Sequence, residues 1–169
     1  MNSKGSNVQV ESVGIILLKD RPGLGASLDG IVEDPSANII RGGLEVKYPY
    51  GKANFNINDA CKDKTFFLKS ENGQISLKEN HNYFYQVQGQ MYVANFKWVD
   101  FVVWYGDHEE LFVQRILFNK QNWLDKCLSA LDLFFKWAVV PELLTRRVER
   151  KLTLLSKEQW IKLQSELCE

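Results

Sequence analysis

The sequence contains few of the residues that form zinc sites or thiol active sites. Its three cysteines, Cys61, Cys127 and Cys168, stand far apart, and none belongs to a CxxC pair of the kind that binds zinc. The two histidines, His81 and His108, are isolated from these cysteines in the chain. The sequence therefore does not support a zinc site or a cysteine–histidine nucleophile pair, and the cysteine usage indicates a reducing compartment.

Long apolar runs and net charge are also missing. No apolar run approaches the roughly 18 residues of a membrane span, and the polar segment Met1–Asn7 lacks the features of a signal peptide. We therefore expect an intracellular protein, cytosolic or nuclear, with no membrane partner. The 21 basic and 21 acidic residues cancel, so overall charge does not favour nucleic-acid binding, and any such role depends on local basic groups.

The residues that are present suit one globular domain, because 45% of them are hydrophobic and 12% are aromatic. The spacing of the apolar residues predicts strands over 8–19, 24–33, 40–48, 97–105 and 109–118. It predicts helices over 81–95 and 119–138, and one helical turn within an irregular segment over 52–79. Pro141 is expected to interrupt the long helix. Residues 142–155 are helix-prone, and Ser156–Gln159 fits a capping box that starts a short last helix.

Two carboxylates and one ammonium form the main candidate site. Glu45 and Lys47 are two residues apart, so on a strand their side chains leave the same face. A turn-forming segment, residues 33–38, separates them from Asp29 and predicts an antiparallel hairpin. With the turn centred near Pro35 and Ser36, Asp29 falls opposite Gly42 or Gly43, and Glu45 lies one diagonal step away, about 7–8 Å between Cβ atoms. The glycines would leave room beside the acid for a hydrated ion or a phosphate.

This group suits the hydrolysis of a phosphodiester. Mg²⁺ prefers oxygen ligands, and two carboxylates with a backbone carbonyl make a reasonable site. The reaction needs an activated water and a sink for negative charge, and a bound cation supplies both. Lys47 would orient or deprotonate the water. An E-x-K triplet is also common on a solvated strand that carries only a weak ion pair, and that interpretation stays open at this point.

A second polar stripe follows along the chain. Tyr83, Gln86 and Gln90 recur at helical spacing beside a stripe of apolar residues. A glutamine amide both donates and accepts hydrogen bonds, so Gln86 suits the positioning of a phosphate or a water. The alternative is a merely amphipathic surface helix.

Four segments together resemble the PD-(D/E)xK nuclease superfamily, and within it the YqaJ-type viral recombinase or phage lambda exonuclease-like family. They are residues 25–30, 43–50, 83–91 and 100–104, in the family's order. The resemblance runs from about residue 8 to about residue 144. It implies an α/β (α+β) fold with a restriction-endonuclease-like core, a central mixed sheet flanked by helices, over 1–140. A C-terminal helical extension is expected over 141–169.

The resemblance also assigns roles to single residues. It implies that Asp29, Glu45 and the backbone carbonyl of Val46 bind Mg²⁺ or Mn²⁺, and that Lys47 handles the nucleophilic water. Gln86 matches the glutamine that the family places beside its catalytic centre. Apart from the resemblance, Lys52 is expected to contact DNA as one of the lysines that follow the strand, and Tyr83 and Gln90 are expected to contact DNA as well.

The chain departs from the family pattern in three places. Leu28 takes the position of a proline, Tyr48 stands where relatives often carry cysteine, and only a polar stub precedes the first predicted strand region. Relatives place helices there, which supply a further acid and an arginine associated with the 5′-phosphate of the DNA end. We therefore expect a fragment of a longer product, an incomplete gene model or a decayed copy.

The leading hypothesis is a metal-dependent DNA exonuclease that hydrolyses phosphodiester bonds at duplex ends in support of recombination. The resemblance implies duplex DNA ends, a single-strand annealing protein and further copies of the chain as partners. The alternative is a truncated, noncatalytic DNA-binding or interaction domain that retains the nuclease fold. An unrelated enzyme is disfavoured, because the sequence has no nucleophile elbow, phosphate loop or zinc spacing.

Overall fold

The computed structural model describes residues 7–52, 55–105 and 111–167. The chain packs as two compact units, Met1–Lys120 and Gln121–Glu169. The second unit begins N-terminal to the predicted domain boundary at residue 140, and the assignment of two functional domains stays a prediction. None of the described helices is long and apolar enough to cross a membrane.

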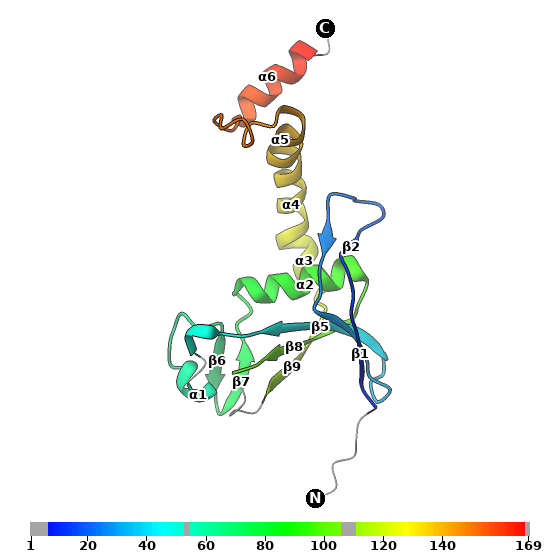
Figure 1. Ribbon diagram of the computed structural model, residues 1–169, viewed down its shortest axis with the longest axis vertical. Coiled ribbons are helices and arrows are strands. Elements are labelled where there is room, and N and C mark those ends of the chain that lie inside the picture. Colours follow the sequence, from blue (N-terminus) through cyan, green and yellow to red (C-terminus); the bar gives the residue numbers. More distant parts are fainter. Residues whose placement is uncertain (1–6, 53–54, 106–110, 168–169) are drawn as a thin grey trace, which may run out of the picture. The chain divides into compact units, whose positions relative to one another are not determined.

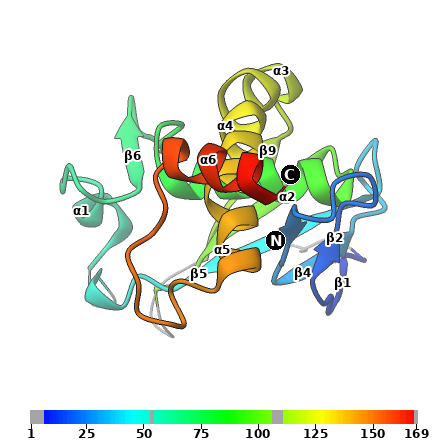
Figure 2. The same ribbon diagram turned by 90° about the horizontal axis from the view of Figure 1, so that it is seen from above.

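The first unit is built on a five-stranded mixed sheet in the order β1-β4-β5-β8-β9. These strands are β1 (Gln9–Glu11), β4 (Gly30–Glu33), β5 (Arg41–Lys47), β8 (Trp98–Val103) and β9 (Phe112–Leu117). Neighbouring strands are antiparallel except for β5 and β8, which are parallel. Helix α2 (Asn82–Ala94) lies across one face of the sheet (Figures 1 and 2). The predicted fold class, a mixed sheet with flanking helices, is confirmed.

The core of this unit lies between α2 and β8. Val87 and Met91, one turn apart on the helix, are fully buried, as are Val99, Phe101 and Val103 on alternate positions of the strand. This pattern follows the 3.6-residue and two-residue periods of the two elements. Burial of such apolar side chains contributes about 1.5–3 kcal/mol each, which fixes the helix on the sheet.

Both of the first two predicted strands are divided. The region 8–19 contains β1 and a short β2 (Ile16–Leu17), and the region 24–33 contains β3 (Gly25–Ala26) and β4. Strands β2 and β3 pair in a separate two-stranded sheet. Between β3 and β4 the chain turns Leu28 into the core. The predicted strand over 24–33 is therefore interrupted at the buried Leu28, and the spacing of the apolar residues did not indicate this break.

The segment after β5 contains more structure than predicted. It begins with η1 (Tyr50–Lys52), and α1 (Ile57–Ala60) confirms the single helical turn. It also contains a hairpin of β6 (Leu68–Glu71) and β7 (Gln74–Leu77), where the prediction of an irregular segment was wrong. Asn72 and Gly73 form its turn with φ values of 52° and 77°. An Asn-Gly pair accepts positive φ at both positions and favours this tight turn.

Helical turns run from Lys120, the last residue of the first unit, to Thr145 in the second unit. They comprise α3 (Lys120–Trp123), η2 (Leu124–Leu128), α4 (Ser129–Phe134), η3 (Phe135–Val139) and α5 (Val140–Thr145), and η2 and η3 are π-helical. The expected interruption at Pro141 was wrong, because helical turns continue through the proline from η3 into α5.

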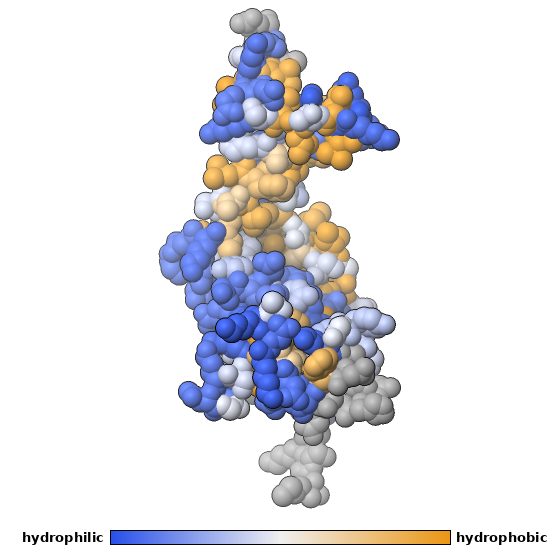
Figure 3. Space-filling model, turned by 90° about the vertical axis from the view of Figure 1, so that its left-hand side faces the viewer, coloured by the Kyte–Doolittle hydropathy of each residue, from blue (hydrophilic) through white to orange (hydrophobic). Residues whose placement is uncertain are grey.

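Residues 146–155 are not helical, although the sequence is helix-prone there. Arg146 has φ 49° and ends α5. The carboxylate of Glu142 then accepts hydrogen bonds from the backbone N–H groups of Arg147 and Val148, at 3.1 and 2.9 Å. The last helix, α6 (Lys157–Leu167), starts with the predicted capping box between Ser156 and Gln159. Figure 3 shows apolar side chains at the surface of this unit. The large apolar residues that are exposed here include Leu133, Phe134, Leu143, Leu144, Val148 and Leu154.

A long turn sets the register of β4 against β5. Gly30 pairs with Leu44 and Glu33 with Arg41, and the N–H of Asp34 donates to the carbonyl of Ile40 at 2.8 Å. The predicted register, with Asp29 opposite Gly42 or Gly43, was wrong because the turn spans 34–40 and is not centred on 35–36. Asp29 instead continues β4 toward Glu45.

Side chains hold this turn against the sheet. Arg115 on β9 forms a 2.9 Å ion pair with Asp34 and a bidentate pair with Asp100, and its guanidinium lies 3.7 Å from the ring centroid of Trp98. The indole N–H of Trp98 donates to the carbonyl of Ile39 at 2.7 Å. The hydroxyl of Ser36 and the guanidinium of Arg115 lower the pKa of Asp34, so this carboxylate stays charged.

Gly42 and Gly43 serve packing and do not leave space beside Asp29. A Cβ at Gly42 would lie 2.3 Å from ring carbons of Trp98, and one at Gly43 would lie 2.4 Å from Leu28 Cδ2. These glycines therefore let buried side chains cross directly over the backbone of β5.

The Gly42→Ala variant should lower the free energy of unfolding by about 1–3 kcal/mol, because the added methyl overpacks against a rigid indole. Urea unfolding measures this change. Gly14→Ala is the control, since a Cβ at Gly14 meets nothing within 4 Å. An unfolding midpoint for Gly42→Ala equal to that of the control would contradict this packing role.

Candidate active site

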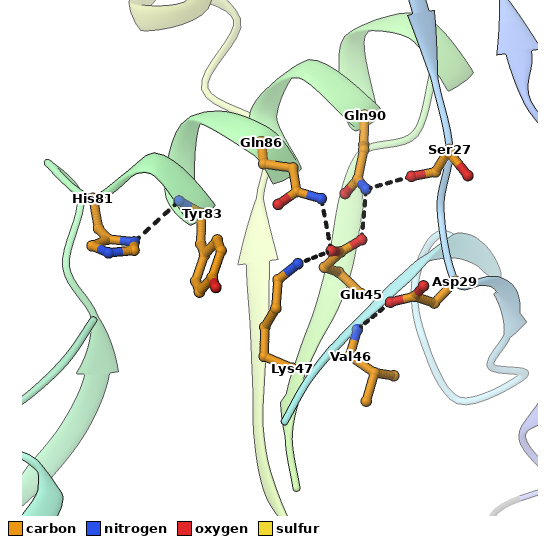
Figure 4. Close-up of polar contacts among 9 residues, drawn as sticks. All are labelled: Ser27, Asp29, Glu45, Val46, Lys47, His81, Tyr83, Gln86 and Gln90. Atoms are coloured by element: carbon orange, nitrogen blue, oxygen red, sulfur yellow. Dashed lines mark hydrogen bonds and ion pairs between the residues drawn. The ribbon is translucent and has the colours of Figure 1, made fainter. Parts of the chain in front are cut away.

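The buried carboxylate of Glu45 is the centre of the candidate site. Glu45 lies on β5 with its side chain toward α2 and is only 3% exposed. Its Oε1 accepts hydrogen bonds from the ammonium of Lys47 and from the amide of Gln86, the latter at 2.7 Å. Its Oε2 accepts from the amide of Gln90 at 2.6 Å. Figure 4 shows the three donors converging on this one carboxylate.

Helix α2 supplies two of the donors. Gln86 and Gln90 are four residues apart and therefore lie on one face of the helix, one turn from each other. Gln90 is 3% exposed, and its amide also donates to the backbone carbonyl of Ser27 at 2.8 Å. The polar stripe predicted from the sequence thus faces a polar group. Gln90 connects the helix both to Glu45 and to the segment before β4.

The second carboxylate, that of Asp29, is attached to the same strand. The N–H of Asp29 donates to the carbonyl of Leu44 at 3.0 Å, and its Oδ2 accepts from the N–H of Val46 at 2.7 Å. Because the N–H and the carbonyl of one strand residue point to the same side, the Val46 carbonyl also faces the Asp29 side of β5. The three oxygen groups predicted to bind metal are therefore gathered around two successive residues of one strand.

The remaining acceptor capacity fits a hard divalent cation. An ionised carboxylate offers about four lone-pair sites, and three donors reach the carboxylate of Glu45, two of them on Oε1. Asp29 Oδ1 has no hydrogen-bond partner among the described residues. The described part of the chain contains no group of three or more Asp, Glu, His or Cys side chains that could hold a metal ion. The Val46 carbonyl would add a third protein oxygen to the two carboxylates, an oxygen set of the kind that Mg²⁺ and Mn²⁺ accept.

Lys47 is held in place from two sides. Its ammonium pairs with Glu45 and lies 4.5 Å from the centroid of the Tyr83 ring. That ring packs edge-on against Phe67 and His81, with centroids 5.1 and 4.8 Å apart. The cation–π contact keeps the ammonium next to the carboxylate and limits its range of motion.

His81 has a structural part in this arrangement. It caps α2, and its Nδ1 accepts from the N–H of Tyr83 at 3.2 Å. Burial, and secondarily the charge of Lys78, lowers its pKa. The ring is therefore neutral at pH 7, and since Nδ1 is an acceptor, the proton is assigned to Nε2.

Comparison with known proteins identifies the family of the chain. The family model described as the YqaJ-like viral recombinase domain matches residues 3–97, more than half of the sequence. The chain belongs to this family. The matched region of the YqaJ-like domain includes Asp29, Glu45, Lys47, Gln86 and Gln90. The family predicted from the four sequence segments is confirmed.

Solved structures share the fold of the YqaJ-like domain. A crystal structure of an alkaline exonuclease from Laribacter hongkongensis matches with a TM-score of 0.56 and 23% sequence identity. The match covers 86% of this chain and 65% of that one. The same exonuclease in complex with dAMP matches with a TM-score of 0.56 and 24% identity, over 85% and 64% of the two chains. The YqaJ-like chain thus spans about two thirds of the length of that enzyme, and curated proteins include no match.

The residues predicted to contact DNA occupy different environments. Tyr83 contacts Lys47, and Gln90 is buried with its amide donated to Glu45 and Ser27. Lys52 forms a 2.9 Å ion pair with Asp63. DNA contact by these three residues stays a prediction. The hydrogen bond from Gln90 to Glu45 was not predicted, although the four-residue spacing of Gln90 from Gln86 was the available signal.

Replacing Gln90 by Met keeps a side chain of similar length but removes the amide that donates hydrogen bonds to Glu45 and Ser27. We expect the free energy of unfolding to fall by about 1–3 kcal/mol, because buried acceptors then lose their partner. Gln86→Met should cost less, since Glu45 Oε1 keeps Lys47. Urea unfolding of both variants tests this order. Equal stability of Gln90→Met and the unmodified protein would show that Gln90 does not hold the carboxylate.

Proposed function

We propose that this YqaJ-like domain is a Mg²⁺- or Mn²⁺-dependent deoxyribonuclease that hydrolyses phosphodiester bonds at the ends of duplex DNA. The observation that carries this proposal is the buried Glu45 carboxylate. Lys47, Gln86 and Gln90 donate hydrogen bonds to it. Asp29 accepts from the backbone N–H of Val46, the next residue on the same strand. Membership in a viral recombinase family and a fold similar to that of an alkaline exonuclease support a role in recombination. The dAMP complex of that exonuclease supports a nucleotide substrate.

Each residue has a defined part in this proposal. Asp29, Glu45 and the Val46 carbonyl hold the divalent ion. The chemistry that the bound ion supplies is a lower pKa of the attacking water and compensation of the charge that develops on the phosphate. Lys47, held by Glu45 and Tyr83, orients that water by donating a hydrogen bond, and it takes the water's proton only after its own ammonium proton has left to solvent.

The two glutamines act by position. Gln86 and Gln90 keep the Glu45 carboxylate in one orientation, so little reorganisation is needed when charge builds up on the phosphate. Gln86 is partly exposed and also suits a hydrogen bond to a phosphate oxygen or a water. Annealing proteins, further copies of the chain and a noncatalytic DNA-binding role stay predictions from the resemblance.

The proposal predicts degradation of 5′-phosphorylated linear duplex DNA in Mg²⁺ or Mn²⁺ and none in EDTA, with closed circular DNA intact. Glu45→Gln should lower the rate by about 100-fold or more, because the neutral amide replaces a metal ligand and reverses the hydrogen-bond polarity. Lys47→Met should lower it by roughly 100-fold or more, the scale of a lost acid–base group. Gel analysis of the remaining duplex measures both rates.

Asp59→Asn is the control, since Asp59 is an exposed carboxylate whose one ion-pair partner among the described residues is Lys62. It should cleave at the unmodified rate. Metal-independent DNA binding without cleavage, by a folded protein, would favour the noncatalytic alternative. Cleavage that is unchanged in Glu45→Gln would overturn the proposed site.

A further inference from the structure

Strand β9 forms an edge of the five-stranded sheet among the described residues, with β8 as its neighbour. The N–H of Phe118 donates to the carbonyl of Lys97 at 2.9 Å, in the same register that pairs β9 with β8. In an antiparallel pair, residues that bond to the neighbouring strand alternate with residues whose backbone groups point away from it. The N–H and carbonyl groups of Val113, Arg115 and Leu117 therefore point toward the open edge.

A side-chain amide already occupies one end of this edge. Gln88 of α2 donates to the carbonyl of Leu117 at 3.0 Å and accepts from the N–H of Asn119 at 2.8 Å. The amide thus gives the edge one donor and one acceptor, as an added strand would. Farther along β9, the backbone groups of Val113 and Arg115 have no such partner among the described residues.

The features that usually protect an edge strand are missing from β9. Natural edge strands are often very short, bulged, or guarded by proline or by a charge that faces solvent. Strand β9 has six residues in one uninterrupted register with β8, and none of them is proline or lysine. Its one charged side chain, Arg115, is ion-paired with Asp34 and Asp100. Val113 and Leu117 are 56% and 70% exposed, so the edge is open to a further strand.

A hollow of about 480 Å³ follows this edge. It is lined by every residue from 114 to 120, together with Phe84 of α2 and Glu79 before that helix. Successive strand residues point to opposite faces of a sheet. A hollow lined by all of them therefore runs along the edge and not over one face, and it gives an extended segment room beside β9.

The two ends of the hollow carry opposite charges. Lys120 lies three residues beyond the end of β9. Glu79 lies at the other end, since the N–H of Leu77 donates at 2.8 Å to the side chain of Gln114, where the lining of the hollow begins. Both charged residues are exposed, and neither forms an ion pair with another described residue. A strand antiparallel to β9 would meet Lys120 first and Glu79 last.

We propose that the edge of β9 binds an extended segment of a partner protein, which adds to the sheet as an antiparallel strand. Apolar side chains border the edge on both faces, Val113 and Leu117 on one and Phe84 on the other. The middle of the segment is therefore apolar, and it carries an acidic residue near its start and a basic residue near its end. This proposal is independent of the proposed nuclease function.

Nuclear magnetic resonance of the ¹⁵N-labelled protein tests the edge. The probe is an acetylated peptide of alternating valine and threonine, with one glutamate near its start and one lysine near its end. The amide signals of Val113, Arg115 and Leu117 should shift saturably with peptide and exchange with solvent more slowly. A peptide with glutamine in both charged positions should bind at least about twofold more weakly, the scale of two exposed ion pairs.

Val113→Pro removes an N–H that points away from β8, so the ladder between the two strands keeps its hydrogen bonds. It should weaken peptide binding by roughly 2- to 13-fold, the worth of one hydrogen bond. Val113→Thr, which keeps the N–H and a β-branched side chain, is the matched control and should bind like the unmodified protein.

Absence of a saturable change at the three amides would overturn the proposal. So would equal binding of the charged and uncharged peptides, or binding that Val113→Pro leaves unchanged. The peptide comparison uses the unmodified protein and decides the matter even where the proline variant does not fold. Protection of the same amides that grows with protein concentration in the absence of peptide would assign the edge to a second copy of the chain and reject the partner.

Discussion

The arrangement of the first unit depends on supplying hydrogen-bond donors to one buried carboxylate. A buried carboxylate is costly unless hydrogen bonds replace the water that it loses. Glu45 meets this requirement with Lys47 from its own strand and with Gln86 and Gln90 from α2. The helix must therefore lie at one height and one rotation over β5. The apolar contacts of Val87 and Met91 hold the helix in that position, and from there Gln86 and Gln90 donate their hydrogen bonds to Glu45.

The second carboxylate reaches the same place by a different route. Asp29 stands directly before β4, and its position depends on the register of β4 against β5. That register is set at the other end of the strands, where Arg115 and Trp98 hold the turn 34–40. Gly42 allows Trp98 to cross β5 closely. Packing remote from the candidate site thus decides which backbone N–H the Asp29 carboxylate accepts from.

Much of this site follows from local periodicity. The two-residue spacing of Glu45 and Lys47 and the four-residue spacing of Gln86 and Gln90 correctly predict which side chains share a face. The register does not follow from them, because it depends on the contacts of Arg115 with residues distant in the chain. The missed hairpin had a local signal in Asn72-Gly73. The end of α5 at Arg146 had no such local sequence signal. There the backbone N–H groups of Arg147 and Val148 donate hydrogen bonds to the side chain of Glu142.

The central claim is that Asp29 and Glu45 form one cation site, and calorimetric titration with Mn²⁺ tests it most directly. The unmodified protein and Asp59→Asn should both bind Mn²⁺, and Asp29→Asn and Glu45→Gln should each lose that binding while remaining folded. Binding that persists unchanged in both of the latter variants, or no binding by the unmodified protein, would contradict the account.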